Sequence, residues 1–110
     1  MQYQNITLLN SSILTIYGEF RYSPLELEDA RHLVREAGEV QSAIGHASTA
    51  TMLSELLDYP IEQNRMEYQQ QPGEAAIIFK LKSRPPEGAI LTREEIEEIG
   101  YEFGILERRR

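Results

Sequence analysis

Apolar and polar side chains alternate most regularly along residues 75–83. In an extended chain, Ile77, Phe79 and Leu81 fall on one face and Lys80 falls on the other. A period of two residues is typical of a strand that packs one face against a core. This segment is therefore predicted to be a β-strand.

Other segments also have the apolar pattern of strands. They are residues 1–10, 19–25, 64–70 and 101–106. A short Pro-Gly turn at 71–74 separates the predicted strands 64–70 and 75–83, which favours an antiparallel hairpin between them. The three arginines at 108–110 follow the last predicted strand and are expected to fray.

Two segments have the marks of single helices. The apolar positions of residues 27–37 share one helical face, and a glycine follows the expected helix end. Thr92 and Glu95 have the spacing of a capping box, which predicts a helix that stops at Gly100. Residues 23–26 also have the form of a capping box, so this stretch is either the end of a strand or the start of a helix.

Residues 40–57 are predicted to form a helix in two parts. Apolar residues recur at helical spacing on both sides of Gly45, which costs a continuous helix about 1 kcal/mol relative to alanine. Ser48 and Thr49 are residue types that cap helices, so we expect a bend or restart near His46. The N-terminal amides of the second part would then favour an anion there. The alternative is a buried histidine, hydrogen-bonded at a helix junction.

Together these patterns predict a single α/β domain over residues 1–110, with a mixed sheet of about five strands flanked by helices. A chain of 110 residues with 41% hydrophobic residues suffices for one core. It has no run of roughly 18 apolar residues that would cross a membrane and no signal-peptide pattern. The cytoplasm is therefore the expected location.

The charge distribution restricts the possible partners. A net charge of −7 argues against binding to duplex nucleic acid, which requires many phosphate contacts. The only two lysines, Lys80 and Lys82, nevertheless form a basic row with Arg84. This row is either a solvated strand face or the site of a small anionic ligand.

The candidate chemistry depends on very few residues. The chain has no cysteine, and its two histidines, His32 and His46, do not have the spacing of metal ligands. His32 is expected on the charged, solvent-exposed side of its helix. Because there is also no phosphate-binding glycine loop and no nucleophile elbow, any catalysis must be metal-free and built on His46, a carboxylate and arginines.

Four motifs resemble the viral ring nucleases, type III anti-CRISPR proteins that cleave cyclic tetra-adenylate. They are Leu-Leu-Asn-Ser-Ser at 8–12, Ser-Ala-Ile-Gly-His-Ala-Ser-Thr at 42–49, Asn-Arg at 64–65 and Arg-Pro-Pro-Glu-Gly-Ala-Ile-Leu-Thr at 84–92. The resemblance spans nearly the whole chain in the same order. It extends to relatives in prophages and bacterial genomes, and for a viral protein it implies the host-cell cytoplasm.

This resemblance implies a homodimer that binds a ring of four adenylates across its two-fold axis. A ribose 2′-hydroxyl would attack the adjacent phosphate without a metal or cofactor, giving linear di-adenylate with 2′,3′-cyclic phosphate ends. Type III CRISPR signalling would thereby be inhibited. Two alternatives are a non-catalytic sponge that sequesters a cyclic nucleotide and a small dimeric module that contacts a host protein.

The resemblance also implies roles for individual residues. His46 would be the general acid that protonates the departing 5′-oxygen. Glu87 would act as general base or hold the imidazole protonated, and Arg84 would neutralise charge in the transition state. Ser11 and Ser12 remain alternatives for one position. The ligand-binding residues implied are Asn10, Ser11, Ser12, Gly45, Ser48, Thr49, Arg65 and Lys80.

Overall fold

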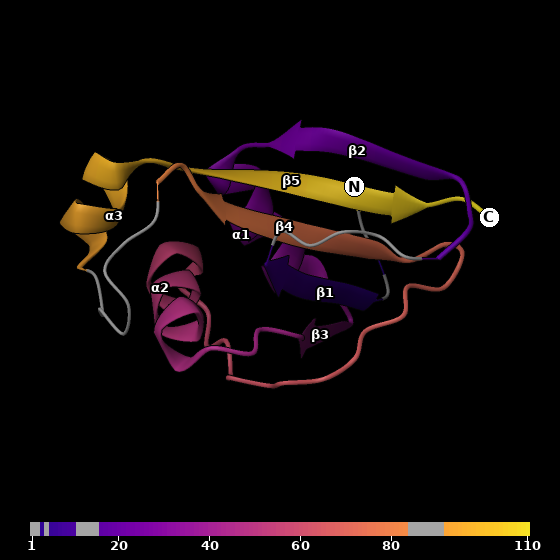
Figure 1. Ribbon diagram of the computed structural model, residues 1–110, viewed down its shortest axis with the longest axis horizontal. Helices are drawn as coiled ribbons and strands as arrows, with labels where there is room; N and C mark the ends of the chain where they lie inside the picture. Colours follow the sequence, from indigo (N-terminus) through magenta and orange to yellow (C-terminus); the bar gives the residue numbers. More distant parts are fainter. Residues whose placement is uncertain (1–2, 4, 11–15, 84–91) are drawn as a thin grey trace.

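The computed structural model describes residues 3, 5–10, 16–83 and 92–110, with Asn10 described only as backbone. The elements follow the chain in the order shown in Figure 1. They are β1 (Asn5–Asn10), β2 (Phe20–Leu25), α1 (Leu27–Glu36), β3 (Glu39–Ser42), α2 (Ala47–Leu57), β4 (Ala75–Leu81), α3 (Arg93–Ile99) and β5 (Tyr101–Arg108).

The strands form one five-stranded sheet in the order β2-β5-β4-β1-β3. β1 lies between β3 and β4 and is parallel to both, whereas β5 is antiparallel to β4 and to β2. The sheet is thus parallel in one half and antiparallel in the other. The predicted α/β fold with a mixed sheet of about five strands flanked by helices is confirmed.

The main core fills the space between one face of the sheet and the helices. Ile77 and Phe79 of β4 point into it, as predicted, and pack with Leu8 of β1 and Leu53 of α2. Figure 1 shows α1 behind the sheet, on the side of this core. The opposite face carries a smaller cluster, built from Ala76, Ile78 and Leu106 with the half-buried Tyr68 and other aromatic and aliphatic side chains packed around them.

The predicted strand at 64–70 and its hairpin are wrong. Residues 64–70 form no strand and run as an irregular segment after α2. Both edges of β4 are already paired, one with β1 and the other with β5, so no edge remains for a hairpin partner. The turn itself is confirmed: Gly73 has a φ of 88°, and the amide of Glu74 donates to the carbonyl of Gln71.

The first part of the predicted two-part helix is wrong as well. Residues 39–42 form β3, in which Val40 pairs with Ile6 and Ser42 pairs with Leu8 of β1. The few apolar residues before Gly45 fit both the helical period and the strand period. They form a strand because β1 offers a parallel edge with which they can pair. The second part is a helix that begins at Ala47, so the restart near His46 is confirmed.

The elements near the C-terminus mostly agree with expectation. Thr92 and Glu95 form the predicted capping box, and α3 ends at Gly100 with a φ of 89°. Residues 20–25 form β2, so the strand interpretation of 23–26 is correct. The frayed tail is wrong: β5 continues to Arg108, and the amide of Arg109 donates to the carbonyl of Glu19 over 2.8 Å.

Candidate functional site

The candidate site lies where the parallel strands end. The carboxyl ends of β1, β3 and β4 are at the same edge of the sheet because these strands are parallel. In Figure 1 their arrowheads point toward the side where α2 and α3 lie. Ligands of open α/β sheets commonly bind beyond the carboxyl ends of parallel strands. Asn10 lies at this edge, at the end of β1, and pairs with Phe79 of β4. Lys80 follows Phe79 in β4 and lies at the same edge.

His46 is exposed at the start of α2. It is the N-cap residue, with extended backbone angles, and its carbonyl accepts a hydrogen bond from the amide of Ala50 over 3.1 Å. Its imidazole makes no capping hydrogen bond. The alternative of a buried histidine at a helix junction is therefore wrong.

Ser48 and Thr49 do not cap α2. The cap position is taken by His46, and both residues lie in the first turn of the helix, where they are half-buried. The first amides of a helix have no partner within the helix and carry a partial positive charge. Ser48 and Thr49 therefore lie next to these amides, in a position to contact an anion bound at the start of α2.

Arg65 lies against Gly45, directly beside His46. A Cβ atom at Gly45 would be 3.6 Å from Nε of Arg65 and 3.9 Å from its Cβ. This is ordinary van der Waals contact, so the arginine stem covers the glycine without excluding a small side chain. The structure therefore brings together Gly45 and Arg65, which lie 20 positions apart in the sequence.

Two neighbours of Arg65 fix the segment that carries it. The amide of Asn64 donates to the carbonyl of Ile44 over 2.8 Å, and its side-chain Nδ2 donates to the carbonyl of Ser42 over 2.8 Å. Nε2 of Gln63 donates to the carbonyl of Gly45 over 3.1 Å. The structure thus gives Gln63 a positioning role that the sequence did not indicate, because an isolated glutamine in a polar stretch carries no local signal.

Lys80 lies further along the same edge of the sheet. Its Nζ is 4.0 Å from Oε1 of Glu102 on β5, and both side chains are more than half exposed. An exposed pair of this kind contributes little to stability, about 0–1 kcal/mol. Lys80 can therefore exchange this carboxylate for another anion at small cost. His32 is exposed on α1, as expected.

Some predicted site residues fall outside the described part of the chain. They are Ser11, Ser12, Arg84 and Glu87, and the side chain of Asn10 is also not described. Among the described residues there is no group of three or more histidines and carboxylates that could hold a metal ion. No helix within residues 16–83 or 92–110 has the length and apolar character needed to cross a membrane.

The comparisons with known proteins identify the family. The family model described as STIV B116-like matches residues 6–103. The chain belongs to the STIV B116-like family. The solved structure of B116 from Sulfolobus turreted icosahedral virus superposes on it with a TM-score of 0.78 and 25% sequence identity, covering 94% of this chain and 98% of that one.

Other B116-like relatives come from both bacteria and archaeal viruses. YddF of Bacillus subtilis is 36% identical over 104 residues, which cover 94% of this chain and 96% of that protein. Protein 26 of Sulfolobus islandicus filamentous virus is 33% identical, with 91% of this chain and 88% of that protein covered. The names of these B116-like proteins state no activity, so they support the fold and the viral relationship only.

Proposed function

We propose that this B116-like protein is a metal-independent ring nuclease. It converts cyclic tetra-adenylate into linear di-adenylate with 2′,3′-cyclic phosphate ends and so inhibits type III CRISPR signalling. The observation that carries the proposal is the exposed imidazole of His46 at the start of α2, with Arg65 lying against the adjacent Gly45. The motif resemblance to the viral ring nucleases supplies the substrate.

The proposed reaction needs only proton transfers and positioning. The ribose 2′-oxygen attacks the neighbouring phosphorus and forms the new P–O2′ bond, while the bond from phosphorus to O5′ breaks. His46, in its protonated form, gives a proton to the departing O5′. The 2′-hydroxyl proton passes to a base, for which the resemblance offers Glu87. Because nucleophile and phosphate belong to one molecule, correct positioning supplies much of the rate enhancement.

Several positive groups support phosphate binding in this acidic protein. Arg65 lies against Gly45, the residue before His46. The first amides of α2 start at Ala47, and Lys80 lies near the end of β4. Backbone amides at a helix N-terminus bind phosphate oxygens well. We also propose a homodimer, because a two-fold dimer presents the same residues to both halves of a four-fold ring.

The test is incubation of the purified protein with cyclic tetra-adenylate in excess EDTA, followed by mass spectrometry of the products. We expect linear di-adenylate with a cyclic phosphate end. His46→Ala should abolish cleavage and leave binding of the ring largely intact, because the imidazole acts on the leaving group. His32→Ala is the matched control, since it removes the other histidine from an exposed site on α1 and should cleave at the wild-type rate.

Three outcomes would contradict the enzymatic part of this proposal. Unchanged turnover in His46→Ala would remove the residue from catalysis. A ring that stays intact but co-elutes with the protein would indicate a sponge. A ring that neither reacts nor co-elutes would mean that the fold is retained without this ligand. Sedimentation of the protein as a monomer, with and without the ring, would reject the dimer.

A further inference from the structure

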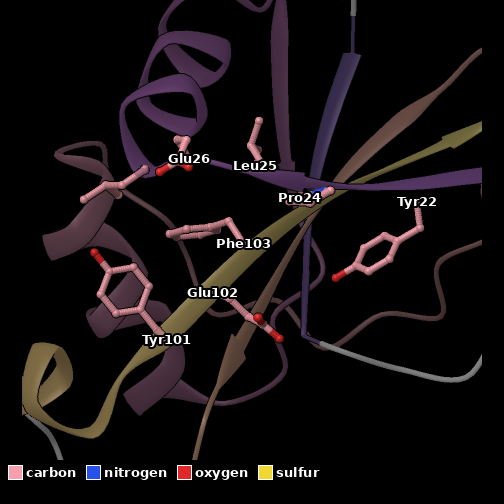
Figure 2. Close-up of a pocket in the computed structure, with 8 residues that line it drawn as sticks. Tyr22, Pro24, Leu25, Glu26, Tyr101, Glu102 and Phe103 are labelled. Atoms are coloured by element: carbon pink, nitrogen blue, oxygen red, sulfur yellow. The ribbon is translucent and has the colours of Figure 1, made fainter.

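A cavity of about 570 Å³ lies at the β2 edge of the sheet, where β2 ends two residues short of the start of β5. β2 stops at Leu25, which pairs with Phe103, whereas β5 begins two residues earlier. Tyr101 and Glu102 are therefore paired with β4 on one side and not with β2 on the other. The cavity lies beside these two residues, and Glu26 and Leu27 at the start of α1 border it. Figure 2 shows Leu25, Glu26, Tyr101 and Phe103 grouped around the end of β2.

Aromatic side chains form the firm part of the cavity wall. The ring centroids of Tyr101 and Phe103 are 5.8 Å apart in an edge-to-face arrangement, and Phe79 packs behind Phe103 at 5.4 Å. Tyr22 approaches from β2, and its ring lies over Gly104, where any Cβ atom would overlap it. The wall is thus held by packing before any ligand arrives.

Two carboxylates border the same cavity. Glu26 is the N-cap residue of α1 but makes no side-chain capping hydrogen bond. Glu102 lies opposite Lys80, with 4.0 Å between their charged atoms. As far as the described residues form it, the lining consists of apolar, aromatic and acidic side chains. Aromatic faces and carboxylates both attract organic cations, and the apolar side chains suit a hydrocarbon segment.

We propose that this cavity binds an aliphatic di- or polyamine. Its methylene segments pack along Leu25 and Tyr101. One ammonium group meets Glu26, and the other passes the unpaired edge of β5 to meet Glu102, which points to the opposite face of the sheet from Tyr101. A hydrated metal ion lacks the hydrocarbon part and gains nothing from the aromatic wall. An ammonium group on Glu102 also replaces the Lys80 amine, which leaves Lys80 available for an anion at the carboxyl edge of the sheet. The inference does not depend on the proposed ring nuclease activity.

The test is isothermal titration of the full chain with spermidine in low-salt buffer, with magnesium chloride as the comparison ligand. We expect spermidine to bind at one site, and magnesium to bind far more weakly. Glu26→Gln and Glu102→Gln should each lower the spermidine affinity about tenfold, as expected for loss of one charge-assisted hydrogen bond. Glu94→Gln, on the exposed face of α3, makes the same charge change away from the cavity and should leave the affinity unchanged.

A second pair of variants separates the cavity from general attraction to an acidic protein. Lys80→Met removes the competitor for Glu102 and should strengthen spermidine binding. Lys82→Met changes the net charge equally but has no carboxylate to release within the described residues, so it should have a smaller effect. The proposal is overturned if spermidine does not bind, if Glu94→Gln weakens binding as much as Glu102→Gln, or if the two lysine variants behave alike.

Discussion

The two ends of the sheet use their charged side chains in different ways. At the end where β5 finishes, Arg108 donates hydrogen bonds to the backbone carbonyls of Gln70, Tyr17 and Arg110, and its guanidinium lies 5.7 Å from the centre of the Phe20 ring. At the end where the parallel strands finish, the described part of the chain offers Arg65 no carboxylate within ion-pair distance.

This difference separates stability from function. The guanidinium of Arg108 connects the last strand to the segments that contain Tyr17 and Gln70. Its removal should therefore lower the stability of the fold. Arg65 is instead positioned by the hydrogen bonds of Gln63 and Asn64, which precede it, and its side chain is exposed to solvent. A charge that is positioned by other groups and paired with none of the described ones is suited to a ligand. Substituting each arginine should therefore affect a different measurement.

The largest effect is expected for Arg65→Ala on ligand affinity. Loss of one charge-assisted phosphate contact weakens binding roughly 10- to 100-fold, and we expect the upper value because a dimer would lose two contacts to one ring. The midpoint of thermal unfolding should not change, since the side chain is exposed. Binding of labelled cyclic tetra-adenylate, measured by fluorescence anisotropy, checks the prediction. A lower melting temperature with unchanged affinity would reverse the roles assigned to the two ends of the sheet.

The next effect is a loss of stability in Arg108→Ala. We expect the free energy of unfolding to fall by about 1.5 kcal/mol, because several carbonyls lose a charged donor and Phe20 loses its cation. Urea denaturation measures this change. Arg109→Ala is the control: its side chain is exposed, and a surface substitution changes stability by roughly 0.5 kcal/mol or less. Equal effects of both substitutions would mean that Arg108 stabilises only through net charge.

The elements that the sequence predicted correctly are those with local signals. The alternation in β4, the capping box at Thr92 and the glycine that ends α3 all depend on residues within a few positions of one another. The apolar alternation after Gly100 likewise identified β5. Side-chain period and capping chemistry are sufficient for such elements, because the physical cause is contained in the segment itself.

The errors fall where a distant partner decides the structure. Residues 39–42 became a strand because β1 offered a parallel edge, and 64–70 remained irregular because β4 had no free edge. The site shows the same limit. The motifs containing His46 and Arg65 were recognised separately, but their contact depends on hydrogen bonds from Gln63 and Asn64 that no local pattern indicates.

The smallest expected effect is a change in the pH dependence of stability at the end of the sheet where β5 finishes. Burial, together with a hydrogen bond from Tyr3 to Oε2 of Glu107, raises the pKa of the Tyr3 hydroxyl from 10.0 to about 12. The folded state then holds this proton more tightly than the unfolded state. The contribution to stability is complete below pH 10.0 and is lost as the pH rises toward about 12. Tyr3→Phe should flatten the fall of unfolding free energy over this range in urea titrations, whereas Tyr17→Phe, at a fully exposed position, should leave the slope unchanged. If the unfolding free energy of Tyr3→Phe falls with pH as steeply as that of the wild type, the bond between Tyr3 and Glu107 does not stabilise this end of the sheet.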